Sequence, residues 1–209
     1  WKQVNAIAGD SYWGLAANGS KFLMFAREYT AQVYLSSDGK IWKIAEDLPY
    51  PTSYLQKCWG ANDEYFVLGR PGTSYITVIN ADTGRNDVYL WPFAIGPMRI
   101  AWMPNIGKWI MVNQLNEVGL TADFVNWTTY TSAFPIEDLV YGDCLYAVGN
   151  VATQHATYDG INWFTVATSA YDYTLRSMAY ADGIGVLVGF YGPSYYMVLH
   201  SIGGTSADL

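Results

Sequence analysis

The sequence predicts an all-β fold, a five-bladed β-propeller of four-stranded blades, and three observations support this prediction. A turn motif of Ser or Thr, then Asp, then Trp recurs along the chain, first in the stretch from Ser36 to Trp42. Apolar segments of strand length accompany each turn with a repeat of roughly forty residues, which is the period of a four-stranded blade. No apolar period typical of a helix is found in the sequence.

The motif, called the Asp turn below, predicts a tight hairpin followed by a buried Trp. Asp38 can accept hydrogen bonds from the backbone just ahead of it, and Gly39 tolerates a positive φ. Trp42 then has a fixed position on the outgoing strand, where its large apolar surface can be buried. Further copies run from Thr121 to Trp127 and from Thr157 to Trp163, a looser copy runs from Asn80 through Asp82 and Gly84 to Trp91, and a last copy, Ser201–Gly204, lacks both Asp and Trp.

Each predicted blade has a small-residue inner strand, a strongly apolar second strand, a third strand and, after the Asp turn, a fourth strand. The blades are expected at about residues 11–46, 54–93, 98–131, 137–167 and 174–204 plus 1–5. Inner strands are expected at Tyr12–Ala17, Leu55–Gly60, Arg99–Met103, Asp138–Tyr141 and Leu175–Tyr180. Second strands are expected at Phe22–Ala26, Tyr65–Gly69, Trp109–Asn113, Leu145–Gly149 and Val186–Phe190, and third strands at Gln32–Leu35, Tyr75–Ile79, Glu117–Leu120, Gln154–Ala156 and Tyr196–Leu199. Fourth strands are expected at Trp42–Ala45, Val88–Phe93, Trp127–Thr131 and Trp163–Ala167.

The fifth blade has no fourth strand of its own, and we expect the N-terminal strand Trp1–Asn5 to complete it. This pairing would close the ring and remove the free sheet edges that otherwise promote aggregation. An open β-sandwich is the alternative, but a sandwich does not explain five equivalent turns. The chain begins at Trp1 without Met, which suggests the ordered part of a longer polypeptide.

Composition excludes several classes of function. Eighteen acidic and eleven basic residues give a net charge of −7, which argues against nucleic acid as a partner because phosphate contacts need clustered Lys and Arg. No run of about eighteen apolar residues is present, so we expect no insertion into a membrane. Cys58 and Cys144 fall at different points of separate repeats, and we interpret them as buried small hydrophobic residues instead of a disulfide. A reducing compartment is compatible with this interpretation.

Strand alternation puts the Asp turns on one face of the predicted propeller and two sets of connecting loops on the other. Tyrosines gather on the loop face, and their apolar rings with polar tips suit stacking on sugar rings or on a protein epitope. Arginines at strand ends on the same face could hold a carboxylate through paired hydrogen bonds. The predicted ligand-binding residues are Arg27, Tyr29, Tyr50, Tyr54, Arg70, Tyr75, Arg99, Tyr173, Arg176, Tyr191 and Tyr195.

The Ser-x-Asp-Gly-x-x-Trp hairpin after an apolar strand resembles the sialidase-like repeats known as BNR or Asp-box repeats. Among them, the chain is most similar to the short form common in tail-fibre and other tail-associated proteins of bacteriophages. The resemblance covers nearly the whole chain, although the second copy departs by insertion and the fifth by loss of Asp. It implies that the Asp turns lie on the face away from the ligand.

Two enzymatic alternatives use residues of the same face. Sialidases need three arginines with a Tyr nucleophile and an acidic partner, for which Tyr173 and Glu28 are candidates, but the count of five blades departs from the six of that family. Arabinanase-like five-bladed hydrolases place three carboxylates at the channel mouth, and the acids available for such a set are Asp10, Glu117, Glu137 and Asp138.

No cofactor or metal is expected from the sequence. His155 and His200 fall one residue out of step when the hairpins are aligned, so they lie on opposite faces of their strands and do not form a shared metal site. No nucleotide-binding loop and no Cys-based metal spacing is present.

The leading hypothesis is a non-enzymatic binding module, a receptor-recognition domain of a phage virion that contacts a host-surface glycan or protein. Its location would be the tail or surface of the virion, after synthesis in the host cytoplasm, with other virion proteins as further partners. The alternatives are a glycoside hydrolase or sialidase-like enzyme, and a structural decoration or assembly domain of the virion.

Overall fold

A computed structural model describes residues 12–26, 33–45, 58–70, 72–149, 153–168, 173–181 and 184–191. The chain forms two compact units, Trp1–Ile100 and Ala101–Leu209, called unit 1 and unit 2 below. Strands and turns make up the described part, and no helix there is long and apolar enough to cross a membrane.

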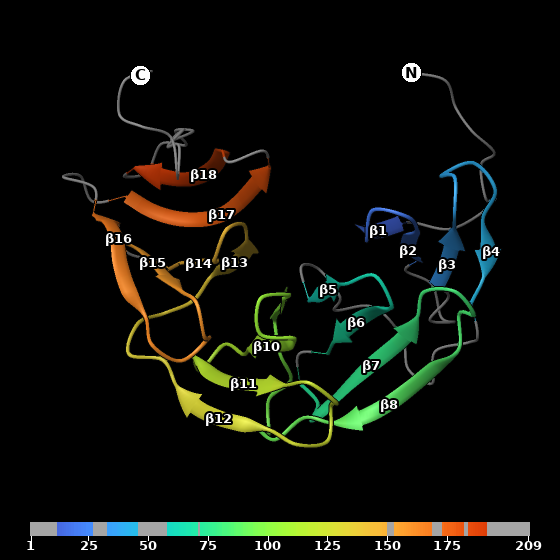
Figure 1. Cartoon of the computed structure of the whole chain (residues 1–209), viewed down its shortest axis with the longest axis horizontal. Helices are drawn as coiled ribbons and strands as arrows, with labels where there is room; N and C mark the ends of the chain where they lie inside the picture. Colours follow the sequence, from blue (N-terminus) through green and yellow to red (C-terminus); the bar gives the residue numbers. More distant parts are fainter. Residues whose placement is uncertain are drawn as a thin grey trace. The chain divides into compact units, whose positions relative to one another are not determined.

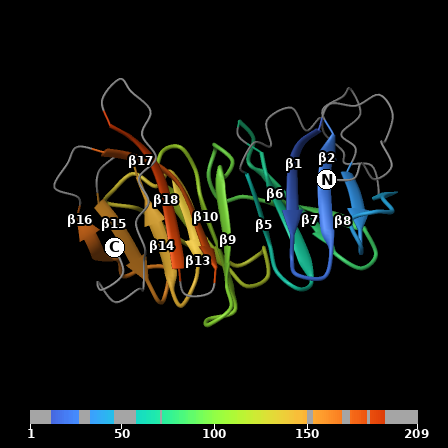
Figure 2. The same cartoon turned by 90° about the horizontal axis from the view of Figure 1, so that it is seen from above.

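Unit 1 contains two four-stranded antiparallel sheets in which each strand pairs with the next along the chain (Figure 1). The first sheet has the order β1-β2-β3-β4, with β1 Tyr12–Ala17, β2 Phe22–Ala26, β3 Val33–Ser36 and β4 Lys43–Ile44. The second sheet has the order β5-β6-β7-β8 (Figure 2), with β5 Trp59–Ala61, β6 Tyr65–Gly69, β7 Tyr75–Asn80 and β8 Asn86–Leu90.

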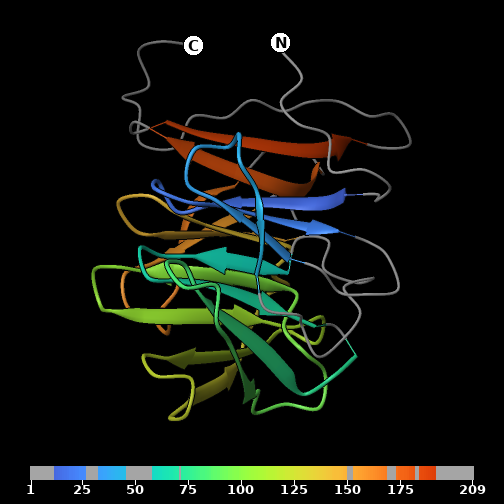
Figure 3. The same cartoon turned by 90° about the vertical axis from the view of Figure 1, so that its right-hand side faces the viewer.

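The same meander repeats in the second half of the chain. The third sheet consists of β9 Arg99–Met103, β10 Lys108–Val112, β11 Glu117–Thr121 and β12 Thr128–Thr131. The fourth consists of β13 Asp138–Tyr141, β14 Leu145–Val148, β15 Thr153–Thr157 and β16 Phe164–Thr168. A long antiparallel pair, β17 Tyr173–Ala181 and β18 Ile184–Tyr191, follows (orange-red in Figure 3).

The cores lie between neighbouring sheets because the second strands are apolar on both faces. In unit 1, Leu23 and Val33 of the first sheet pack with Phe66, Leu68 and Ile79 of the second. In unit 2 the two clusters have the members Met103, Ile110, Val112, Val118, Leu120, Leu145 and Ala147, and Cys144, Tyr146, Val148 and Ala156. Cys58 and Cys144 are free thiols and buried, which agrees with their interpretation as small hydrophobic residues.

Several predicted strands agree with the structure to the residue, among them Tyr12–Ala17, Tyr65–Gly69 and Asp138–Tyr141. The fourth strand of the second sheet was misplaced. It is Asn86–Leu90 and not Val88–Phe93, because the turn at Asn80 is short and the chain pairs again at Asn86 with Ile79. The predicted strands Trp1–Asn5 and Tyr196–Leu199 lie outside the described residues.

Candidate functional site

The meander gives each four-stranded sheet two chemically different ends. The link from first to second strand and the link from third to fourth strand lie at one end, called the turn end. The link from second to third strand and the connection to the next sheet lie at the other, called the loop end. The Asp turns are at the turn end, and the predicted binding residues are at the loop end.

The three Asp turns share one hydrogen-bond pattern. In the first, Asp38 Oδ1 accepts from the backbone N–H groups of Lys40 at 2.8 Å and Ile41 at 2.9 Å, while Ser36 Oγ accepts from Gly39 N–H at 2.9 Å. Asp123 and Asp159 repeat these contacts at 2.8–3.0 Å. Each carboxylate therefore satisfies the backbone donors of its own turn, which is a structural role.

The residue after the Asp has a positive φ in all three turns. Gly39 has φ 68° and Gly160 has φ 75°, and Phe124 takes the same position with φ 61°. Phe124 is 7% exposed and its ring lies 5.9 Å from that of Trp109, so burial of the ring offsets the strain of this conformation. Backbone hydrogen bonds, led by the one from Asn126, hold the pKa of Asp123 below its usual range.

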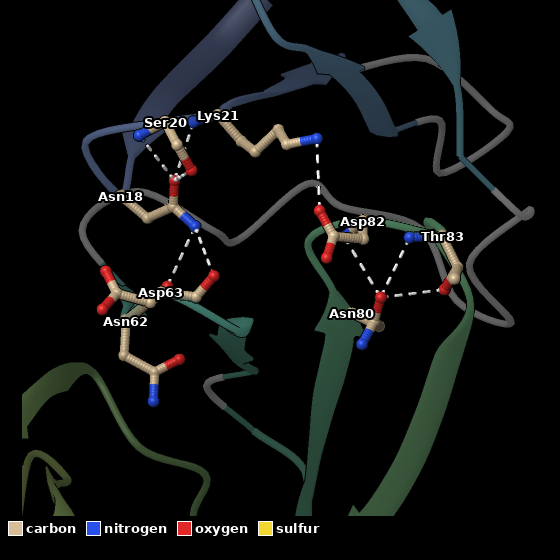
Figure 4. Close-up of polar contacts among 8 residues, drawn as sticks. All are labelled: Asn18, Ser20, Lys21, Asn62, Asp63, Asn80, Asp82 and Thr83. Carbon is tan, nitrogen blue, oxygen red and sulfur yellow. Dashed lines mark hydrogen bonds and ion pairs between the residues drawn. The ribbon is translucent and has the colours of Figure 1, made fainter.

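The looser copy in the second sheet uses a different residue for the same purpose. Asn80 Oδ1 accepts from the N–H groups of Asp82 at 3.1 Å and Thr83 at 2.9 Å, and Gly84 has φ 74°. Asp82, which the sequence pattern matched to the Asp of the motif, instead pairs with Lys21 at 3.2 Å (Figure 4). In the other three sheets the Trp of the motif directly precedes the fourth strand. Arg85 has that position in the second sheet, so Trp91 is not the Trp of the motif.

Turn ends also join neighbouring sheets within each unit. In unit 1, Asn18 Nδ2 donates to the carbonyls of Asn62 at 3.0 Å and Asp63 at 3.2 Å (Figure 4). In unit 2, Asn105 Nδ2 donates to the carbonyl of Tyr158 at 2.7 Å. Gly160 packs so closely on Leu120 that an added Cβ would lie 2.4 Å from the side chain.

At the loop end of unit 1, residues 91–98 form a tightly held loop. The indole of Trp91 is buried and donates to the Ile95 carbonyl at 2.8 Å. Gly96 approaches the Arg70 carbonyl so closely that a Cβ would lie 1.9 Å away, and Ser74 Oγ donates to the Ala94 carbonyl at 3.4 Å. This loop therefore fixes the backbone on either side of the link between β6 and β7.

Three predicted binding residues stand at strand ends next to this loop: Arg70 just after β6, Tyr75 at the start of β7 and Arg99 at the start of β9. The Tyr75 side chain is 45% exposed, and the two arginines are partly buried. Arg99 Nη1 donates to the Met98 carbonyl at 2.8 Å. Burial raises the pKa of the neighbouring Cys58 thiol to about 11, an effect that the Arg99 charge opposes.

Between its third and fourth sheets, unit 2 has an aromatic contact that the sequence did not reveal. Phe134, in the connection between the third and fourth sheets, stacks on His155 with ring centroids 3.7 Å apart and contacts Trp163 edge-on at 5.3 Å. Burial lowers the pKa of His155. His155 is thus a packing residue, and the proximity of Phe134 and His155 follows only from the tertiary arrangement.

For three further predicted binding residues the structure gives only the position along a strand. Strand register pairs Tyr173 with Tyr191 across β17 and β18, which puts both at one end of that sheet, and Arg176 lies in β17. The remaining predicted residues lie outside the described part of the chain, namely Arg27, Tyr29, Tyr50, Tyr54 and Tyr195.

Two of the four acids considered for catalysis make structural hydrogen bonds through their carboxylates. Glu117 Oε2 accepts from Asn113 Nδ2 at 2.6 Å. Asp138 Oδ2 accepts from Ser177 Oγ at 2.7 Å and from the Met178 N–H at 2.9 Å, which joins β13 to β17. Asp10 lies outside the described residues, within which no cluster of three or more metal-ligating side chains is found.

Comparison with known proteins identifies the fold and not a family. No family model and no curated protein matches the chain. Among solved structures, YCF48 bound to D1 peptide is similar with a TM-score of 0.69 and 14% identity, over 92% of this chain and 66% of that one. A streptogramin B lyase has a TM-score of 0.63 and 14% identity, over 84% and 61%. A virginiamycin B lyase from Staphylococcus aureus has a TM-score of 0.66 and 13% identity, over 88% and 70%.

The chain spans less than two thirds of the YCF48 chain and of the streptogramin B lyase chain. At these identities the similarity establishes an all-β, propeller-like fold built from four-stranded antiparallel sheets.

Proposed function

We propose that this chain is a non-enzymatic binding module that holds its ligand at the loop ends of its sheets. In this proposal the fold is a single five-bladed β-propeller, and Trp1–Asn5 closes the ring by completing the last blade. On the resemblance of the Asp turns to Asp-box repeats, we propose that the chain belongs to a bacteriophage tail-fibre or tail-associated protein. Its ligand is then a host-surface glycan or protein, and its location is the virion.

One observation carries the proposal, namely that the two ends of the sheets differ in whether their polar side chains are already bound by the protein's own backbone. At the turn end, Asp38, Asp123 and Asp159 are occupied by the backbone of their own turns. At the loop end, the loop of residues 91–98 packs on the backbone beside Arg70 and Tyr75, and Arg99 begins the strand that follows it. A half-exposed Tyr at a sheet end that also has arginines is suited to sugars or to a protein epitope. The peptide in the YCF48 structure is a precedent for binding by a similar fold.

A glycan array tests the proposal directly. The full chain, labelled and applied to an array of bacterial surface glycans, should give a specific signal that Tyr75→Ala reduces at least about tenfold, as expected for a binding hot spot. Tyr158→Ala is the matched control, because Tyr158 is similarly exposed but lies at the turn end. Equal loss in both variants, or an unchanged signal with Tyr75→Ala, would reject the loop-end assignment.

The enzymatic alternatives are weakened by the hydrogen bonds of Glu117 and Asp138, which hold each carboxylate in a structural contact. A hydrolase would release new reducing ends from host polysaccharide. We expect none after prolonged incubation with the full chain, and a release that Glu117→Gln or Asp138→Asn abolishes would replace the binding proposal with an enzymatic one.

A further inference from the structure

Unit 1 has an open groove at its turn end, in a place where unit 2 is filled by its own side chains. The groove encloses about 380 Å³ between the Asp turn after β3 and the Asn80 turn after β7. Leu35 and Ala45 line it from the first sheet, and Gly84 lines it from the second. It is separate from the loop-end site described above.

Strand pairing identifies Ala45 as the counterpart of Tyr130. The Ala45 N–H donates to the Val33 carbonyl at 2.7 Å, and Tyr130 pairs with Val118. Val33 and Val118 stand at the same distance before their Asp turns. Unit 1 therefore has a methyl group where unit 2 has a phenol ring.

In unit 2 this ring closes the contact between the third and fourth sheets. Tyr130 Oη donates to the Gly160 carbonyl at 2.7 Å and accepts from Trp163 Nε1 at 2.7 Å. Leu120, beneath the same contact, is 1% exposed. The phenol thus satisfies polar groups at the turn end and covers an apolar floor.

In unit 1 both members of the aromatic pair are replaced. Arg85 takes the place of Trp163, since each directly precedes the first paired residue of its fourth strand. The Arg85 side chain is 72% exposed and lies 3.8 Å from Asp87, so it turns to solvent and does not cover the groove. Leu35, the counterpart of Leu120, is only partly buried.

We propose that this groove binds a tyrosine side chain presented by a partner protein, in the role that Tyr130 has in unit 2. Gly84 packs against Leu35 as Gly160 packs against Leu120, with 3.1 Å and 2.4 Å to an added Cβ. Gly84 also packs on Ala45, which is 8% exposed and would lie 3.5 Å from an added Cβ, so the ring would lie on Leu35 beside Ala45 with its hydroxyl toward the backbone of the Asn80 turn. The partner site is distinct from the loop end, so the chain can hold both partners at once.

Charge at the rim indicates which residues accompany that tyrosine. Lys21 is paired with Asp82, and Asp38 is bound by its own turn, whereas Lys43 is exposed and forms no ion pair among the described residues. A carboxylate next to the partner tyrosine complements Lys43. Ile41 and Ile44, 64% and 58% exposed, add apolar contact at the rim.

The probe is N-acetyl-L-tyrosinamide, titrated into the isotopically labelled full chain and followed by NMR. We expect saturable shifts of the Leu35, Ala45 and Gly84 amides at millimolar concentration. N-acetyl-L-phenylalaninamide, which lacks only the hydroxyl, should bind about threefold to tenfold more weakly, the effect of one hydrogen bond. Equal affinity for the two probes, or no shift at these amides, would overturn the proposal.

Two variants locate the binding. Ala45→Tyr fills the groove with a tyrosine side chain of the protein itself and should abolish the shifts. Lys40→Tyr adds the same side chain outside the groove and should leave the shifts unchanged. Persistence of binding in a folded Ala45→Tyr variant would contradict the proposal.

Lys43→Glu changes only an exposed side chain and tests the rim even where Ala45→Tyr does not fold. The acetylated peptide Ala-Glu-Tyr-Ala should bind the unmodified chain more tightly than Ala-Lys-Tyr-Ala, and Lys43→Glu should reverse this order. An unchanged order would remove Lys43 and the acidic neighbour from the proposal.

Discussion

The turn ends of the two units contain the same motif but differ in how fully side chains fill the space between neighbouring sheets. In unit 2, Tyr130 and Trp163 fill the space between neighbouring sheets, and Gly160 is pressed onto Leu120. In unit 1, alanine and arginine stand in the two aromatic positions and a groove remains. The Asp and the Ser or Thr of each turn therefore fix their own backbone, while the residues at the positions of Tyr130 and Trp163 decide how tightly one sheet is joined to the next.

The strongest test of this comparison uses glycine at equivalent turn positions. Gly160→Ala should lower the free energy of unfolding by about 2–5 kcal/mol, because left-handed strain adds to a clash with Leu120. Gly39→Ala should cost only about 1–2 kcal/mol, since the nearest atom is 3.8 Å from an added Cβ and strain alone remains. Urea unfolding measures both, and equal losses would show that the contact with Leu120 does not matter.

Tyr130→Phe removes the hydroxyl that links two sheets while keeping the ring. It should cost about 1–3 kcal/mol, because the Gly160 carbonyl and the Trp163 indole each lose a partner in a partly buried place. Chemical denaturation against the unmodified chain gives the value. A loss below the error of the measurement would mean that solvent replaces both bonds.

The same hydroxyl predicts a pH dependence. Burial raises the pKa of Tyr130 from 10.0 to about 12, so the folded state favours the protonated phenol. Its contribution to stability is complete below pH 10 and is lost as the pH rises towards about 12. Stability of the unmodified chain should fall more steeply over this range than that of Tyr130→Phe, and parallel curves would contradict the assignment.

Asn105→Ala removes a single side-chain bond between sheets, the one to the Tyr158 carbonyl. Because this contact is exposed to solvent, the expected loss in unfolding free energy is about 0.5–1.5 kcal/mol. Asn105→Asp keeps the size but not the donor, so it should lose a similar amount. If thermal or urea unfolding of Asn105→Asp matches the unmodified chain, the bond contributes nothing.

The smallest effect is expected for Lys21→Ala. The Lys21–Asp82 pair spans 3.2 Å at the edge of the groove, and the Asp82 side chain is 83% exposed. Such pairs contribute about 0.2–1 kcal/mol and are screened by salt. A double-mutant cycle with Asp82→Ala isolates the pair, and a coupling larger than the loss measured for Asn105→Ala would reverse the expected order of these two contacts.

Strand positions were largely predictable from the sequence because the Asp turns and Asn turns mark strand ends. Asn18 and Asn62 cap their turns as their local chemistry suggests, and both adjoining second strands begin as predicted. The error at the second Asp turn arose because Asn80, in the position of Ser36, caps the turn without the Asp and the loop is shorter, so that Trp91 was aligned in place of Arg85.

The site was less predictable, since it depends on contacts between distant residues. The grouping of Arg70, Tyr75 and Arg99 follows from strand order, and the sequence placed them on one face. Burial of Trp91 beneath its own loop, the stacking of Phe134 on His155 and the difference between Ala45 and Tyr130 have no local signature. They become visible only when neighbouring sheets are in place.

Hydrogen exchange of the full chain with the glycan that gives the strongest array signal tests the central claim most directly. The account predicts slower exchange for the loop-end amides of residues 72–75, 93–96 and 98. It predicts unchanged exchange for the Asp turns at residues 37–41, 122–126 and 158–162. Protection confined to the Asp turns would contradict it, because the ligand would then lie at the end of the sheets that we assign to structure.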